Sequence, residues 1–186
     1  EVTKGVIYII RNPLDVAVSF ARHNNKSIDR TINSMNNSQS GLCMQKTKLF
    51  SQLPQEIDSW SSHVNSWIHQ SGLPIHIIRY EDMLEKPYTT FSNVLDFLNI
   101  KFTRSKIHNA LFNSSFKILS MQEKMNGFKE RNINSLKFFR SGQKDDWKKH
   151  LNKYQATQII QKHRTIMEEF GYLKVKRNFF GNYKLD

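Results

Sequence analysis

The chain has 186 residues, 38% of them apolar, which is enough for one compact domain with its own core and too short for two large ones. Its 28 Lys and Arg against 16 Asp and Glu give a formal net charge of +12, a surplus that favours anionic partners. The single cysteine, Cys43, excludes an internal disulfide, and no apolar run approaches the length of a membrane span, so we expect a cytoplasmic protein without membrane association.

Two short apolar runs predict the strands of a parallel sheet. The first is Val6–Ile10 and the second is Ile75–Ile78, and their largely apolar character indicates strands covered on both faces. Helical patterns lie between the two runs. This βαβ order predicts an α/β fold with a parallel sheet flanked by helices.

A helix is predicted to begin directly after the first strand. Asn12 can cap it, Pro13 suits the first helical position, and Asp15 stands where a capping-box partner would lie. Because the helix follows a strand, its free N–H groups are expected at the carboxyl edge of the sheet, where α/β proteins bind ligands.

The next two segments differ in periodicity. Residues 24–45 are rich in Asn and Ser with little periodicity, which predicts a mobile loop or lid. An apolar stripe at alternating steps of three and four then predicts one helix face that belongs to the core rather than to a ligand site. Its members are Phe50, Leu53, Ile57, Trp60, Val64 and Trp67.

The remaining helices are predicted over 88–98, over shorter pieces within 103–126, and over 155–170. Gly171 is expected to end the last helix as a left-handed cap. Residues 174–186 form a basic tail, either docked or frayed.

Three segments carry candidate anion-binding groups. Arg11 ends the first strand, and Ser19 lies two helical turns beyond Asn12, so a guanidinium and a hydroxyl could share one phosphate. In the alternative interpretation Arg11 pairs with a carboxylate such as Asp15, and Ser19 merely fills a helix surface. The segment RYEDM (79–83) ends the second strand, and the basic segment FFRSGQKDDWKKH (138–150) suits an anion.

In this order, the segments RNPLDVAVS (11–19), RYEDM and the Arg-Ser-Gly turn at 140–142 resemble the nucleotide-dependent sulfotransferases, most closely the cytosolic type. The resemblance extends to about Leu173, and Asn12 rather than Asp favours the cytosolic over the Golgi type. It implies a P-loop-NTPase-like sulfotransferase fold, present here in part. It also implies the cofactor 3′-phosphoadenosine 5′-phosphosulfate (PAPS), whose product is adenosine 3′,5′-bisphosphate (PAP).

The resemblance implies six cofactor-binding residues: Arg11, Ser19, Tyr80, Arg140, Ser141 and Gly142. The first two would bind the 3′-phosphate and Tyr80 would approach the adenine. The last three would close over the 3′-phosphate from the other side.

Two positions depart from the family pattern. Ser141 stands where Lys is usual, a loss that could weaken binding about tenfold unless a neighbour such as Lys144 compensates. Asp145 stands where Gly is usual and adds a carboxylate near the phosphate, although Asp tolerates a left-handed backbone better than most residues. The family's dimerisation stretch is not recognisable after Trp147, so the oligomeric state is left open.

Two parts of the family pattern are missing from the sequence, namely the loop that grips the 5′-phosphosulfate and a catalytic His shortly before the first strand. We expect both upstream of Glu1, so residues 1–173 would form a sulfotransferase domain without that loop, and these residues alone would be inactive. His23, the nearest imidazole in sequence, lies too far along the helix to be a good base. No His pair has a metal-binding spacing, and no metal site is expected.

The leading hypothesis is therefore an enzyme that transfers a sulfuryl group from PAPS to a hydroxyl or amine of a small-molecule or glycan-like acceptor. A second hypothesis is a degenerate, non-catalytic nucleotide- or polyanion-binding module, although no stacking platform for nucleic acid is apparent. A nucleotide kinase would need a Walker-type loop, which the sequence lacks. The sequence does not identify the acceptor, whose pocket residues 24–45 are expected to border.

Overall fold

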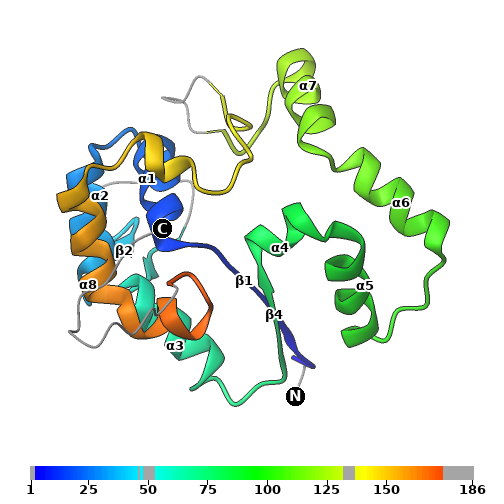
Figure 1. The fold of residues 1–186 in the computed structure, drawn as a ribbon, viewed down its shortest axis with the longest axis horizontal. Coiled ribbons are helices and arrows are strands. Elements are labelled where there is room, and N and C mark those ends of the chain that lie inside the picture. The colour runs from blue at the N-terminus through cyan, green and yellow to red at the C-terminus, as the bar shows by residue number, and fades with distance from the viewer. Residues whose placement is uncertain (1–2, 46, 48–52, 132–136, 174–186) are drawn as a thin grey trace, which may run out of the picture.

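The computed structural model describes residues 3–45, 47, 53–131 and 137–173 (Figure 1). Its strands are β1 (Val6–Ile10), β2 (Gly41–Leu42), β3 (Gln55–Glu56) and β4 (Ile75–Arg79). Its helices are α1 (Pro13–His23), α2 (Ile28–Asn36), α3 (Trp60–Ile68), α4 (Tyr80–Glu85), α5 (Pro87–Phe97), α6 (Arg104–Asn113), α7 (Phe116–Asn126), the 3₁₀ helix η1 (Asp146–Lys149) and α8 (Lys153–Glu169).

The two predicted strands pair with each other in parallel. β1 and β4 are in register from Val6 opposite Ile75 to Ile10 opposite Arg79, while β2 and β3 form a separate short antiparallel pair. In Figure 1, α1, α2, α3 and α8 lie on one side of the β1–β4 pair and α4 to α7 form an arc on the other. The predicted α/β class with a parallel sheet and flanking helices is confirmed.

Burial along β1 alternates, so the prediction of a strand covered on both faces is wrong for the described residues. Ile10 is 2% exposed and packs with Val64 and Ile166, whereas Ile9 is 55% exposed and Ile7 is 38% exposed. Successive side chains of a strand point to opposite faces, and α3 and α8 cover only the face of Ile10. An apolar run shows that both faces of a strand are suited to burial. It does not show that another element packs on each face.

The main core joins α1, α2 and α8. Leu14 and Ala17 of α1 pack against Ile32 of α2 and against Ile159 and Met167 of α8, and all five are almost fully buried. This packing fixes α1, whose first turn carries the candidate anion site, against the rest of the domain.

Residues 24–45 are not a simple loop, which corrects the prediction for this segment. Ser27 caps α2 by accepting a hydrogen bond from Arg30 N, and Ile32 and Met35 are buried on one face of the helix. The apolar residues Ile28, Ile32 and Met35 have helical spacing. The high Asn and Ser content obscured this short amphipathic pattern.

The predicted helix over residues 50–67 is present only from Trp60 onward, and its core role is wrong for Trp67, which is 40% exposed because it points away from the core that Val64 joins. Gln55–Glu56 is a strand, Asp58 has a left-handed backbone with φ +65°, and Ser59 caps α3 by accepting from Ser62 N. Of the apolar stripe, Val64 is buried but Leu53 is 82% exposed. Phe50 lies outside the described residues.

The other predicted helices are confirmed as α5, α6, α7 and α8. Gly171 has φ +68°, and its N–H donates to Glu168 O just past the end of α8, as expected for a left-handed cap. The predicted basic tail, 174–186, lies outside the described residues.

Candidate functional site

The start of α1 has a defined cap at the sheet edge. Asn12 Oδ1 accepts a hydrogen bond from Leu14 N at 3.1 Å, and Pro13 occupies the first helical position, as predicted. The Asn12 N–H donates to Glu81 Oε1 at 3.1 Å, so the role predicted for Asp15 is taken by a residue of α4. This bond ties the end of β1 to the end of β4.

Asp15 instead holds the segment that precedes η1. Its two carboxylate oxygens accept hydrogen bonds from Asp145 N and Trp147 N, each at 2.9 Å. Burial raises the pKa of Asp15, while the two backbone hydrogen bonds and the charge of Arg11 oppose that shift. Asp15 is therefore the link that positions residues 140–147 beside α1.

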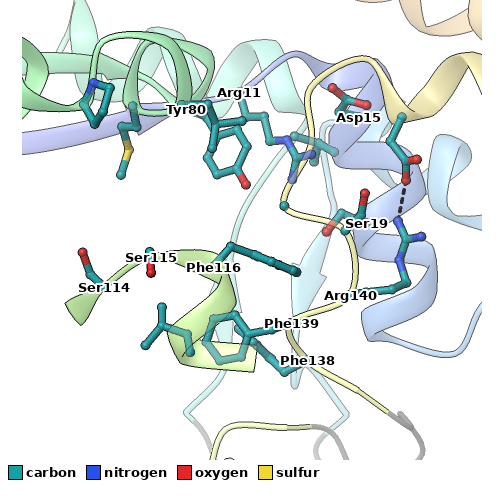
Figure 2. Close-up of a pocket in the computed structure, with 18 of the residues that line it drawn as sticks. Arg11, Asp15, Ser19, Tyr80, Ser114, Ser115, Phe116, Phe138, Phe139 and Arg140 are labelled. Carbon is teal, nitrogen blue, oxygen red and sulfur yellow. Dashed lines mark hydrogen bonds and ion pairs between the residues drawn. The ribbon is translucent and has the colours of Figure 1, made fainter. Parts of the chain in front are cut away.

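A cavity of about 960 Å³ opens between α1, the arc of α4 to α7 and the segment 137–142. All six residues predicted to bind the cofactor line it, and Arg11, Ser19, Tyr80 and Arg140 are labelled in Figure 2. Residues from α4, α5, α6 and α7 make much of the remaining wall apolar, including Met83, Leu84, Phe91, Leu111 and Leu119. The structure thus brings together segments separated by more than a hundred residues, and the individual roles of the six remain predictions.

The Arg11 guanidinium contacts a backbone carbonyl and an aromatic ring, rather than the carboxylate of the alternative interpretation. Its Nη2 donates to the carbonyl of Gln143 at 3.0 Å, and its guanidinium lies 4.3 Å from the centre of the Tyr80 ring. Arg11 Nε is buried without a hydrogen-bond partner among the described residues. A buried donor of this kind is costly unless it is paired, so a ligand acceptor would stabilise it.

Arg140 lines the cavity but is engaged with a carboxylate. Its Nη2 donates to Asp146 Oδ2 at 2.6 Å, and this contact is drawn as a dashed line in Figure 2. The pairing with Arg140 lowers the pKa of Asp146. Ser19 also lines this cavity, so a hydroxyl and a guanidinium are both present in its wall.

Gly142 is required by a close contact with an aromatic residue. Its φ is +58°, and a Cβ atom there would lie 2.3 Å from the ring of Phe116. Phe116 begins α7 and faces Tyr80 across the cavity in Figure 2. Phe116 could not be singled out from the sequence, because an aromatic residue at a helix start gives no signal of a ligand site until the fold places it at the cavity.

The two departures from the family pattern have different consequences. Asp145 has φ +59°, as its tolerance of a left-handed backbone allows. Lys144 forms an ion pair with Glu85 and does not line the cavity, so it does not replace the Lys expected at Ser141.

His23 lines the cavity and makes an edge contact with Phe138, with ring centres 6.3 Å apart. Within the described part of the chain, His, Cys, Asp and Glu side chains form no group of three or more that could hold a metal. None of the helices in the described ranges has the length and apolar character needed to cross a membrane.

The fold and cavity define an α/β protein with a cationic pocket at the carboxyl edge of parallel strands. The family model described as the sulfotransferase domain matches residues 3–171. The chain therefore belongs to the sulfotransferase family.

Known relatives and solved structures agree with this assignment. Sulfotransferase 2A6 of Rattus norvegicus is 27% identical over 157 residues, covering 81% of this chain and 52% of the relative. Sulfotransferase 6B1 of Danio rerio is 26% identical over 159 residues, covering 83% and 49% respectively. The chain thus spans about half the length of these curated relatives.

Two solved structures share the fold. The mouse sulfotransferase SULT7A1 complexed with PAP has a TM-score of 0.66 at 21% identity. The match covers 90% of this chain and 61% of the SULT7A1 chain. Retinol dehydratase in complex with androsterone and PAP has a TM-score of 0.61 at 17% identity. The match covers 88% of this chain and 47% of the retinol dehydratase chain.

Proposed function

We propose that this chain supplies the part of a PAPS-dependent sulfotransferase that binds the 3′-phosphoadenosine end of the cofactor. The whole protein would transfer a sulfuryl group from PAPS to a hydroxyl or amine acceptor. The observation that carries the proposal is the single cavity that unites Arg11 and Ser19 with Tyr80 and the 140–142 turn. Two structures with a similar fold were solved in complex with PAP, which supports the same cofactor.

Different cavity residues would bind the 3′-phosphate and the adenine of the nucleotide. Arg11, with an unpaired buried Nε, and Ser19 would bind the 3′-phosphate through charge-assisted and hydroxyl hydrogen bonds. The rings of Tyr80 and Phe116 would contact the flat faces of the adenine. Arg140 would add a second guanidinium once the phosphate competes with Asp146 for it.

Sulfuryl transfer needs in-line placement, cations for the developing charge and a base for the acceptor hydroxyl, as phosphoryl transfer does. PAPS, when bound, supplies the activated sulfuryl group. Within these 186 residues we assign nucleotide binding and orientation, and we assign the base and the sulfate-gripping loop to the whole protein. We accordingly propose residues 1–173 as the nucleotide-binding part of the domain and 174–186 as a basic tail.

A small-molecule acceptor fits the cavity better than a large polyanion. Beyond its cationic end the wall is formed by apolar side chains such as Met83, Leu84, Phe91 and Leu111, which would contact apolar carbon atoms. A related structure contains retinol with PAP, which gives a precedent for such an acceptor in that protein. A glycan acceptor is the alternative, and the resemblance to the cytosolic type supports a cytoplasmic location.

The proposal is tested by calorimetric titration of the chain with adenosine 3′,5′-bisphosphate. Arg11→Ala should weaken binding about tenfold or more, because it removes a charge-assisted contact to the 3′-phosphate. Arg30→Ala is the matched control, since Arg30 lies on α2 and does not line the cavity.

Equal binding by the unchanged chain and Arg11→Ala would rule out the assignment of Arg11. A chain that ignores the bisphosphate but binds RNA with a steep salt dependence would instead be a polyanion-binding module.

A further inference from the structure

α1 carries a third polar side chain on the face that borders the cavity. Arg22 follows Ser19 by three residues and Asp15 by seven, so the three side chains lie along one side of the helix. All three line the cavity. Arg22 was not among the residues singled out from the sequence, because nothing in its neighbours along the chain marks it.

Arg22 belongs to a cationic cluster around one buried carboxylate. Asp146 is 6% exposed, and its Oδ2 lies 2.6 Å from Arg140 Nη2 and 3.8 Å from Arg22 Nη1. Lys149 Nζ lies 3.6 Å from Asp146 Oδ1. Arg22 also contacts His150, with Nη2 3.2 Å from Nδ1 and 3.1 Å from Nε2 of that ring.

The cluster has more positive than negative charge. Three cationic side chains, Arg22, Arg140 and Lys149, share the single carboxylate of Asp146. Burial lowers the pKa of Arg22, the neighbouring Arg140 lowers it further, and Asp146 acts in the opposite direction. Two guanidinium groups held this close together at a cavity wall favour a second anion beside Asp146.

We propose that Arg22 is a further phosphate-binding residue, which with Arg140 contacts the 3′-phosphate of the nucleotide. This inference rests on the proposed function and adds a residue to the same site. Asp146 and His150 are positioning residues in this arrangement, since each contacts the Arg22 guanidinium. A planar guanidinium has five donors, so these contacts leave donors for a phosphate.

The experiment compares two nucleotides that differ only in the 3′-phosphate. Calorimetry of the chain with adenosine 3′,5′-bisphosphate should show about tenfold weaker binding for Arg22→Ala, whereas binding of adenosine 5′-monophosphate should be unchanged. Arg22→Lys keeps the charge and loses the fork, so its bisphosphate affinity should lie between the two. Arg30→Ala on α2 should match the unchanged chain with both nucleotides.

The outcomes separate this inference from the proposed function. If the unchanged chain prefers the bisphosphate and Arg22→Ala retains that preference in full, the inference is overturned and the proposed function stands. If Arg22→Ala and the folded Arg22→Lys both lose affinity for the two nucleotides to the same extent, Arg22 has a purely structural role. That result would also overturn the inference. A chain with no affinity for the bisphosphate would overturn the proposed function, and this inference with it.

Discussion

Asp145 has a left-handed backbone, with φ +59°. It directly precedes Asp146, whose carboxylate pairs with Arg140. Its N–H is fixed by Asp15, so the segment cannot relax to a more favourable φ without losing that hydrogen bond. A residue with a Cβ pays about 1–2 kcal/mol in this region, and Asp somewhat less. The strain is therefore imposed by the contact that positions the segment.

Asp145→Gly should raise both stability and nucleotide affinity. Relief of the backbone strain, less the greater entropy of Gly in the unfolded chain, gives about 0.5 kcal/mol in urea unfolding. Removal of one exposed carboxylate near the cationic cluster should raise bisphosphate affinity about twofold at low salt. Asn99→Gly, at an exposed position with φ +54°, is the control and should leave affinity unchanged. Lower affinity in Asp145→Gly would contradict this account of the site.

Individual site residues could be predicted only where they belong to a recognisable segment. Arg11, Ser19 and Tyr80 were singled out because each stands at a strand end or on the helix that follows it and belongs to a segment that resembles the family. All three line the cavity, and their roles in binding remain predictions. Phe116 and Arg22 were not singled out from the sequence. Phe116 can be identified only once the fold places it in the same cavity wall as Tyr80, and Arg22 only once its contact with Asp146 is known. The pairing of Arg140 with Asp146 is likewise a contact that the sequence leaves open.

At the scale of elements, the segment 140–147 is held to α1 by side chains rather than by apolar packing alone. Asp15 accepts its two backbone N–H groups, and Arg11 donates to its Gln143 carbonyl. Asp15 also lies in the first turn of α1, where the helix dipole favours a negative charge. The helix start and the segment therefore act as one unit at the cavity.

Asp15→Asn should loosen this unit. The amide keeps one acceptor oxygen and turns the other position into a donor, so one of the N–H groups of Asp145 and Trp147 loses its partner. The expected cost is about 1–3 kcal/mol in urea unfolding, with faster amide exchange at Asp145 and Trp147. Asp96→Asn, at an exposed position on α5, should change neither. Unchanged exchange at both amides would show that the segment is held by other contacts.

Elements with an apolar run or a clear apolar periodicity could be predicted, and an element within a polar segment could not. β1, β4, α5 and α8 were found from apolar patterns and end signals. The helix α2 was missed because its Asn and Ser residues suggested a loop, although Ser27 caps it and its apolar residues recur at helical spacing. Its place is decided by packing against α1 and α8.

For the molecule as a whole, a buried neutral histidine ties stability to pH. His163 on α8 is 1% exposed, accepts or donates a hydrogen bond with Ser61 Oγ at 2.8 Å, and packs its ring 5.4 Å from that of Trp60. Burial lowers its pKa from 6.5 to about 4, with the charge of Lys162 as a smaller cause. Burial likewise lowers the pKa of His63, which adds to the same effect.

The domain should consequently lose stability as the pH falls from 6.5 to about 4. In this range the unfolded chain binds a proton at residue 163 that the native fold excludes, so acid favours the unfolded state by up to about 3 kcal/mol. Urea unfolding of the chain across this range should show that loss, and His163→Gln should show a correspondingly flatter profile. His108→Gln, at an exposed position on α6, should keep the original slope. A His163→Gln profile parallel to that of the unchanged chain would mean that His163 becomes protonated without cost, and that the packing of α8 on α3 tolerates a charge.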